Sequence, residues 1–402
     1  MAGPLVWRTC PERLCRTVGK PRHIGRGNHR SDAGFTGPTW LLRPLPILPT
    51  PLTHRPMTDP RSPRPLLALL LLALPLAVAG AVLPDPATSA PTGFTGPALL
   101  SDLPEVDAEE LLRDLEILAH DSMEGRRPGT PGIERARSFI LETLDERGVA
   151  PLHGERFQSF EFQNRRDGQN YVGHNLLGWI PGTDHPDSYL VLTAHYDHLG
   201  VVNGDIYNGA DDNASGVAAL LAAARHFTAN PPAHSVVLAF LDAEEMGLQG
   251  ARAFVNEAVV PLDRIVMNVN LDMVSRSEVG EIYAAGTYHY PFLLPLVEEV
   301  AEASRITVLT GHDSPDLPPG QDWTMASDHA PFHQQGIPFI YFGVEDHPGY
   351  HDPSDTFENI TPAFFVESTR SIIHFVTLAD REGQAILEQS GRALAVDGAD
   401  AP

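Results

Sequence analysis

Cysteine is nearly absent from this sequence. The only two cysteines, Cys10 and Cys15, lie close to the N-terminus, so the rest of the chain can neither form internal disulfides nor bind a metal through thiolates. Lysine is rarer still, with Lys20 as the single example among 402 residues. A zinc site in the main part of the chain would therefore need histidine, aspartate and glutamate ligands.

Positive charge is also scarce and unevenly distributed. The chain has a formal net charge of −24, and residues 1–64 carry 11 basic but only 3 acidic side chains, which leaves a net charge of −32 on the remainder. A surface this acidic repels phosphate groups, which argues against nucleic acids and anionic membranes as partners. The hydrophobic share of 42% is ordinary and allows a sizeable core.

The first part of the chain lacks the periodicity of a folded domain. Residues 1–56 are rich in Arg, Pro and Gly, which predicts a mis-annotated or disordered extension, with translation starting at Met57. Residues 84–104 are rich in Pro, Ala, Gly and Thr and are typical of a linker. We therefore expect one folded domain at residues 105–382, followed by a disordered acidic tail at 383–402.

A short apolar run precedes the linker. Arg61 and Arg64 stand before the run Leu66–Ala79, and small residues follow it. This order is typical of a secretory signal peptide, expected at residues 57–83 with its apolar and small residues ending at about residue 81. An uncleaved anchor helix is the alternative, although the run is short for a membrane span. The sequence thus predicts a secreted or periplasmic protein with no stable membrane association after cleavage.

Strand-like and helix-like segments alternate along the predicted domain. A helical period begins at Val106, and a second helix is expected to end near Glu146. Strands are expected at 156–163, 171–180, 188–194, 235–242, 264–271, 280–285 and 337–342, and helices at 214–229, 248–258, 290–303 and 361–381. This alternation predicts an α/β fold, a three-layer αβα sandwich with a mostly parallel central sheet.

Histidine and acidic residues follow three of the predicted strands. His195 comes after SYLVLTA, Glu244 after SVVLAFLDA and Asp272 after RIVMNVN. In open α/β sheets the ligand site lies beyond the carboxyl ends of the strands. Together with Asp212 in GADDNASG and His351 in GYHDPSDT, these residues indicate a two-zinc hydrolase, because carboxylates and imidazoles suit zinc.

Two of these segments contain pairs with separable roles. Asp197 is two residues after His195 and is expected to bond the far ring nitrogen of that imidazole, which would fix its orientation; His198 is expected to be a surface bystander. In the Glu244-Glu245 pair, one carboxylate can bind metal while the other acts as general base.

The segment NGADDNASG offers Asp211, Asp212 and Asn213. A two-metal site needs a carboxylate that bridges both ions, and the small residues here let the backbone approach a metal closely.

Several motifs together identify a family. The segments EGRRPGT, HYDH, GADDNASG, AEEMGLQG, NLDM, SDHAPF, GIP and YHDPSDT, between about residues 110 and 380, resemble the zinc aminopeptidases of peptidase family M28, which have the phosphorylase/hydrolase-like α/β fold. The resemblance implies that Asp212 bridges the two ions and that the Asp212–Asn213 peptide is cis. It also makes the predicted domain an M28-type catalytic domain.

The resemblance further implies a role for each site residue. One zinc ion would be bound by His195, Asp212 and Asp272, and the other by Asp212, Glu245 and His351, with Glu244 as the base. Tyr350 matches a tyrosine that in some members bonds the oxyanion, with simple packing as the alternative. Asp328 is expected to support the ligands from behind, and Asp355 to shape the loop that presents His351.

The predicted function is a secreted metallo-aminopeptidase that acts on peptides with a free N-terminus and uses two Zn²⁺ ions, for which Co²⁺ or Mn²⁺ could substitute. The loop 311–326 either rims the pocket and sets side-chain preference or is plain surface.

A single-zinc enzyme similar to glutaminyl cyclases is the alternative function, and a metal-free binding module on the same fold is a further alternative. The sequence carries no signal for an oligomeric state.

Overall fold

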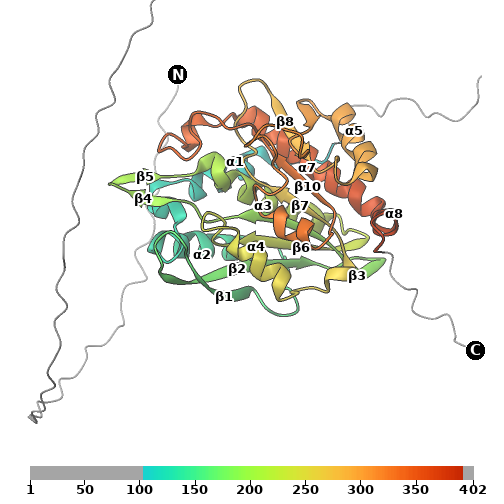
Figure 1. Ribbon diagram of the computed structural model, residues 1–402, viewed down its shortest axis with the longest axis horizontal. Coiled ribbons are helices and arrows are strands. Elements are labelled where there is room, and N and C mark those ends of the chain that lie inside the picture. Colours follow the sequence, from blue (N-terminus) through green and yellow to red (C-terminus); the bar gives the residue numbers. More distant parts are fainter. Residues whose placement is uncertain (1–102, 393–402) are drawn as a thin grey trace, which may run out of the picture. The chain divides into compact units, whose positions relative to one another are not determined.

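The structure, a computed structural model, describes residues 103–392 and is built around a mixed eight-stranded sheet (Figure 1). The strand order is β1-β2-β6-β3-β7-β10-β8-β9, and β6, β3, β7 and β10 run parallel at its centre. The strands are β1 (Phe157–Gln163), β2 (Asn170–Ile180), β3 (His185–His195), β6 (His234–Leu241), β7 (Ile265–Leu271), β8 (Glu281–Ala285), β9 (Thr307–Thr310) and β10 (Phe339–Gly343), and a separate two-stranded ribbon is formed by β4 (Gly200–Val202) and β5 (Asp205–Tyr207).

Helices cover both faces of this sheet. They are α1 (Ala108–Leu118), α2 (Pro131–Glu146), α3 (Gly216–Ala229), α4 (Gln249–Asn256), α5 (Leu294–Ala303), α6 (His329–Gln334), α7 (Pro362–Arg381) and α8 (Gly383–Gln389), with short helical segments η1 (Asp121–Arg126), η2 (Ala210–Ser215), η3 (Leu262–Arg264), η4 (Pro291–Leu293) and η5 (Phe357–Asn359). Helix α3 lies against the central strands with α1, α2 and α7 beside it, whereas α4 and α6 cover the opposite face. The predicted three-layer α/β architecture is confirmed.

The central strands are apolar on both faces because both faces are covered. In β3, Leu190 and Leu192 pack into the core beneath α3, while Val191 between them packs toward α4 with Phe254 and Val237. A continuous apolar run is what a parallel strand buried on both sides requires. These runs are the reason why the positions of the central strands could be predicted from sequence.

The structure differs from the prediction in its shorter elements. The ribbon β4–β5, strand β9 and helix α6 were not predicted, because elements of three to six residues are too short to establish a period. The expectation that the chain frays from residue 383 is wrong for its first residues, since α8 forms there and buries Ile386 and Leu387 in the main core.

The predicted extension, signal peptide and nearly all of the linker lie outside the described residues, as do residues 393–402. Within residues 103–392, no helix combines the length and apolar character that crossing a bilayer would require.

Candidate metal centre

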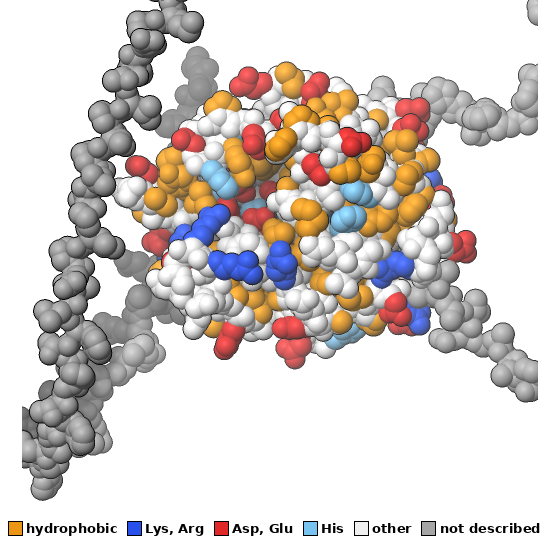
Figure 2. All heavy atoms as spheres, viewed as in Figure 1, with side chains coloured by type: hydrophobic (Ala, Val, Ile, Leu, Met, Phe, Trp, Pro, Cys, Tyr) orange, Lys and Arg blue, Asp and Glu red, His pale blue; other side chains and the backbone are white. Residues whose placement is uncertain are grey.

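The predicted site residues meet at the carboxyl ends of the central parallel strands. His195 is the last residue of β3, Asp272 directly follows β7, and Glu244 and Glu245 come shortly after β6. These side chains, with Asp212, Tyr350 and His351, line a pocket of 410 Å³ whose other lining residues are Arg166, Gly247, Leu248, Met273, Gly320, Trp323, Met325, Ala326, Tyr341, Val344 and Asp346. In Figure 2 acidic side chains lie at the bottom of a hollow, with histidine and arginine side chains around it. Trp323 and Met325 place part of loop 311–326 in the pocket wall.

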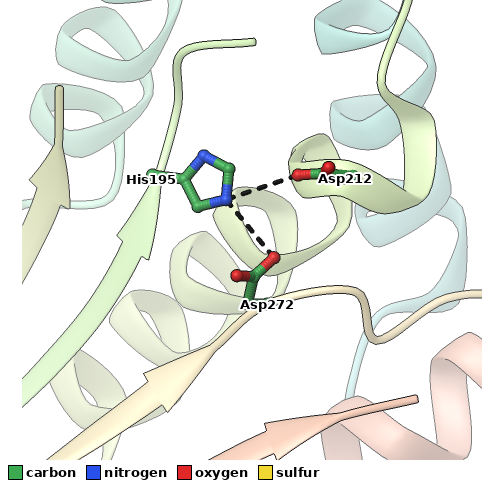
Figure 3. Close-up of side chains that lie close together, drawn as sticks. All are labelled: His195, Asp212 and Asp272. Carbon is green, nitrogen blue, oxygen red and sulfur yellow. Dashed lines mark hydrogen bonds and ion pairs between the residues drawn. The ribbon is translucent and has the colours of Figure 1, made fainter. Parts of the chain in front are cut away.

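A first group of donors surrounds His195. Its Nε2 atom lies 3.3 Å from Asp272 Oδ1 and 3.4 Å from Asp212 Oδ1, so the imidazole edge faces two carboxylates (Figure 3). All three side chains are buried. One nitrogen and two oxygens within 4.8 Å of one another could hold one metal ion, and we call these three residues the His195 cluster.

A second group shares Asp212 with the first. His351 Nε2 lies 3.1 Å from Asp212 Oδ2 and 3.3 Å from Glu245 Oε1, and we call Asp212, Glu245 and His351 the His351 cluster. The two oxygens of Asp212 thus face different imidazoles, Oδ1 toward His195 and Oδ2 toward His351. This is the arrangement that a carboxylate bridging two ions requires.

His198 is not the surface bystander that we expected from the sequence. Its side chain is buried, and its Nδ1 atom lies 2.8 Å from Glu245 Oε1 and 3.8 Å from Asp212 Oδ2. The signal that could have found it is the HYDH spacing, in which a second histidine follows His195 by three residues as the chain leaves β3.

The electrostatics of the pocket are dominated by carboxylates. Burial alone would lower the pKa of His195, but Asp272, Glu244 and Asp212 raise it well above its usual value. Contacts with Asp212 and Glu245 raise the pKa of His351 to about 10. The field of the site therefore attracts positive charge, which a bound cation would supply.

The two adjacent glutamates have opposite pKa shifts. Burial raises the pKa of Glu244 well above its usual value, and nearby carboxylates including Asp328 and Glu245 add to this. Burial also acts to raise the pKa of Glu245, but the imidazoles of His198 and His351 outweigh it and lower that pKa. The two adjacent glutamates therefore lie in opposite electrostatic surroundings, which suits them to different tasks.

Asp197 orients its neighbours through other atoms than we predicted. The far ring nitrogen of His195, Nδ1, lies 3.2 Å from the backbone carbonyl oxygen of Asp197 and 3.7 Å from its carboxylate. The Asp197 carboxylate instead accepts the backbone N–H of Glu244 at 3.0 Å. Asp197 still links the ends of β3 and β6. Its carbonyl oxygen contacts His195 at the end of β3, and its carboxylate accepts the N–H of Glu244 shortly after β6.

Asn213 connects the segment that carries Asp212 to the end of β7. Its Nδ2 donates to the carbonyl of Leu271 at 2.9 Å, and its Oδ1 accepts the N–H of Gly216 at 2.9 Å. A Cβ atom at position 216 would lie 2.3 Å from Asn213 Oδ1, so only glycine permits this approach. The Asp212–Asn213 peptide bond is cis, as the resemblance implies.

The Asp355 side chain, expected to shape the loop of His351, bonds the backbone around Asp212 instead. Its carboxylate accepts the N–H groups of Asp211 and Asp212, with the shortest N···O distance 3.0 Å to each. Asp211 points elsewhere, accepting from Ser275 N at 2.7 Å and contacting His347 Nε2 at 3.0 Å. Asp211 and Asp212 therefore have different surroundings, and of the two Asp212 is the one that belongs to both clusters.

A row of buried hydrogen bonds leads through the sheet to Asp272. Asn268 donates to Thr193, Thr193 to Asn270, Asn270 to Ser327, and Ser327 donates to Asp272 Oδ2 at 2.7 Å. Burial acts to raise the pKa of Asp272, but His195 and the Ser327 hydroxyl lower it overall. Sequence reasoning did not find Ser327, since serine and asparagine in apolar surroundings carry no distinctive spacing.

Asp328, expected behind the ligands, lies next to Ser327 at the start of α6. It is fully buried, and neither of its oxygens has a hydrogen-bond partner among the described residues. Burial and the charge of Asp272 raise its pKa to about 7, against the opposite effect of His195. Asp328 therefore acts on the clusters by charge, with no hydrogen bond to a predicted ligand.

Arg126, also missed from the sequence, supports the backbone of both loops that face the site. Its guanidinium is fully buried and donates to the carbonyl of Tyr196 at 3.0 Å and to that of Gly209 at 2.9 Å. Burial lowers its pKa to about 10, while Asp212 and Asp355 oppose this shift. Arg126 therefore remains a cation near neutral pH, buried behind the carboxylates.

A model of peptidase family M28 matches residues 175–376, half of the chain. The chain belongs to peptidase family M28. Among curated proteins it is 35% identical over 207 residues to aminopeptidase YwaD of Bacillus subtilis, covering 48% of this chain and 41% of that protein. It is 31% identical to a probable glutamate carboxypeptidase VP8 of Zea mays, covering 53% of this chain and 30% of that protein. This M28 chain thus spans less than half the length of these relatives.

Solved structures share the fold of this M28 chain at low identity. A zinc aminopeptidase from Bacillus subtilis is 18% identical with a TM-score of 0.57, covering 69% of this chain and 96% of that chain. A glutaminyl cyclase from Fimbriiglobus ruber is also 18% identical with a TM-score of 0.57, covering 71% of this chain and 99% of that chain. The predicted family and fold are therefore confirmed, and the likeness extends to two kinds of enzyme.

Proposed function

We propose that this chain is a two-zinc aminopeptidase that hydrolyses the first peptide bond of substrates with a free N-terminus. The observation that carries the proposal is the position of Asp212, whose two carboxylate oxygens each face a separate imidazole. The relationship to aminopeptidase YwaD supports this substrate class.

The donor atoms fit zinc. One ion would be held by the His195 cluster and the other by the His351 cluster, which offer only imidazole nitrogens and carboxylate oxygens. Glu245 Oε1 is buried without a hydrogen-bond partner among the described residues, and a cation would satisfy it. When bound, the ions would polarise the scissile carbonyl and acidify the attacking water; Co²⁺ or Mn²⁺ could take their place.

Glu244 is the residue suited to move protons. It lines the pocket beside both clusters, and burial raises its pKa above the usual value of a glutamate, which favours a group that accepts and returns a proton. In the proposed reaction Glu244 takes a proton from the attacking water and gives it to the leaving amine. The remaining carboxylates of the pocket, among them Asp346, favour a substrate that presents an ammonium group.

Tyr350 is proposed to donate a hydrogen bond to the oxyanion. Its ring stacks on His351 at 4.0 Å, and burial together with Asp212 and Asp272 raises its pKa, so the hydroxyl keeps its proton. A Tyr350→Phe variant retains the stacking and is expected to lose kcat by about 10²-fold, the effect of removing one oxyanion donor. Steady-state kinetics would show this loss at unchanged metal content. A kcat within twofold of the parent would assign Tyr350 to packing alone.

The proposed function is tested by counting metal ions and measuring turnover on the same preparation. We expect two zinc ions per chain by elemental analysis, and release of p-nitroaniline from aminoacyl-p-nitroanilides that a chelator abolishes and added zinc restores. Chelator-insensitive release or no release at any metal loading would contradict the proposal.

A glutaminyl-cyclase activity is the second candidate, because solved glutaminyl cyclases share the fold. One ion per chain, together with cyclisation of a peptide that begins with glutamine, would identify that function. The same preparation distinguishes the two activities, since cyclisation releases ammonia and leaves the peptide uncut.

We also propose that the protein is exported through the signal peptide predicted at residues 57–83. N-terminal sequencing of the protein recovered outside the cytoplasm would locate the cleavage site. An N-terminus at or shortly after residue 81 is expected.

A further inference from the structure

The imidazole of His198 is buried beside the His351 cluster with no hydrogen-bond partner on either ring nitrogen among the described residues. The residue is 1% exposed. A buried polar group without a partner is costly, and such groups in folded proteins call for an explanation. We propose that His198 is a further ligand of the metal ion at the His351 cluster, bound through Nδ1. This inference rests on the proposed two-metal function.

The distances around this position suit His198 as a ligand of the ion. His198 Nδ1 is 2.8 Å from Glu245 Oε1 and 3.8 Å from Asp212 Oδ2, while His351 Nε2 is 3.3 Å and 3.1 Å from the same two oxygens. Ligands about 2.0–2.2 Å from a tetrahedral zinc ion are separated by roughly 3.3–3.6 Å. The four measured separations run from 2.8 to 3.8 Å, and His198, Asp212 and Glu245 each offer a ligand atom within 4.8 Å of the other two. His198 can therefore share an ion with these two carboxylates.

The contact between His198 and Glu245 lacks the geometry of a hydrogen bond. Nδ1 and Oε1 lie 2.8 Å apart, yet neither atom has a hydrogen-bond partner among the described residues. With the imidazole proton on Nε2, the lone pairs of Nδ1 and Oε1 repel each other at this separation, and a cation between the two atoms would remove that repulsion. An ion bound by both atoms would turn the repulsion into two bonds and would place the imidazole proton on Nε2.

The surrounding backbone is shaped to hold this imidazole. Gly209 has φ +57°, and a Cβ atom there would lie 2.6 Å from Cδ2 and 2.7 Å from Cγ of His198. The backbone N–H of His198 donates to the carbonyl of Arg126 at 3.3 Å. Glycine at 209 thus provides the space for the ring, and the Arg126 segment holds the chain that carries it.

The proposal makes the two metal positions unequal. The His195 cluster supplies one imidazole and two carboxylates, whereas the other position gains a second imidazole. His351 has a side chain 38% exposed, while the His198 side chain is fully enclosed. His198 is therefore the more enclosed of the two imidazoles proposed to bind this ion.

The test compares zinc affinity in the full chain with that of a His198→Asn variant. Metal-free protein would be titrated with zinc against a chromophoric chelator. We expect the parent to bind two zinc ions. In the variant, the zinc affinity of one site should be unchanged and that of the other should fall by at least ~10-fold. That figure is the lower limit for loss of a residue that only supports a metal ligand. His347→Asn is the matched control, since His347 contacts Asp211 and neither cluster; it should bind both ions as the parent does.

A second measurement needs no variant and so does not depend on how a mutant folds. In the ¹¹³Cd-substituted chain with ¹⁵N-labelled histidine, one cadmium should couple to one imidazole and the other to two, one of them through Nδ1. Two ions with one imidazole each, or equal affinities in parent and His198→Asn, would overturn the His198 assignment and leave the two-metal function intact. A parent that binds a single ion would overturn both.

Discussion

Replacing Glu244 by glutamine is expected to lower kcat by about 10³-fold while both metal ions remain bound. Glutamine keeps the size of the side chain but cannot carry the transferred proton, and general acid–base catalysis contributes roughly 10²–10⁴-fold. Glu244 belongs to neither cluster. Its backbone N–H donates to Asp197, and this bond does not depend on the side chain at position 244. Elemental analysis and single-turnover kinetics on one preparation would measure the two quantities together.

Glu245→Gln is the matched control for that variant. The two residues are adjacent and equal in size, yet Glu245 Oε1 contacts both His198 and His351. We expect the Glu245 variant to lose metal at the His351 cluster, and activity only as a consequence. A Glu244→Gln enzyme with a near-normal rate would remove Glu244 from the role of base.

Replacing Arg126 by methionine is expected to lower the free energy of unfolding by about 4 kcal/mol or more. The guanidinium donates to four backbone carbonyl groups, those of Leu118, Tyr196, Asn208 and Gly209. Each buried acceptor left without a donor costs about 1–3 kcal/mol. Methionine fills much of the volume but donates nothing, so the loss would be large beside a typical total of about 5–15 kcal/mol.

Urea denaturation of metal-free protein would measure the effect of the Arg126 variant without a contribution from bound ions. Arg127→Met is the control, because Arg127 is 38% exposed and pairs with Asp167 only at 3.9 Å; its loss should cost less than about 1 kcal/mol. Equal stabilities of the two variants would show that the carbonyl groups around Arg126 find other donors.

The positions of the central strands and of the residues at their ends could be predicted because each depends on a local pattern. A strand buried on both faces is a continuous apolar run, and a polar residue that ends the run lies at the carboxyl edge of a parallel sheet. His195 and Asp272 are of this kind. The family resemblance added Asp212 and His351, which no strand precedes directly.

The remaining contacts depend on how loops far apart in the sequence meet. The segment around Gly209 packs against the His198 ring, and Asp355 reaches the backbone of Asp212 across 143 residues. No local spacing encodes such pairs. Asp197 illustrates the same limit on a smaller scale, since its carboxylate was predicted to bond His195, whereas its backbone carbonyl oxygen makes that contact.

The row of hydrogen bonds from Asn268 to Asp272 restricts how the interior of the sheet can evolve. Each side chain in the row donates to the next. Asn268 and Asn270 belong to β7 and Thr193 to β3, and their neighbours along these buried strand segments are mostly apolar. Changing any one of them to an apolar residue leaves a buried neighbour unpaired, which costs more than changing them together. Substitutions that make the interior of the sheet fully apolar must therefore change these positions together. Among them, the loss of Asn270 would remove the donor that holds the Ser327 hydroxyl near Asp272.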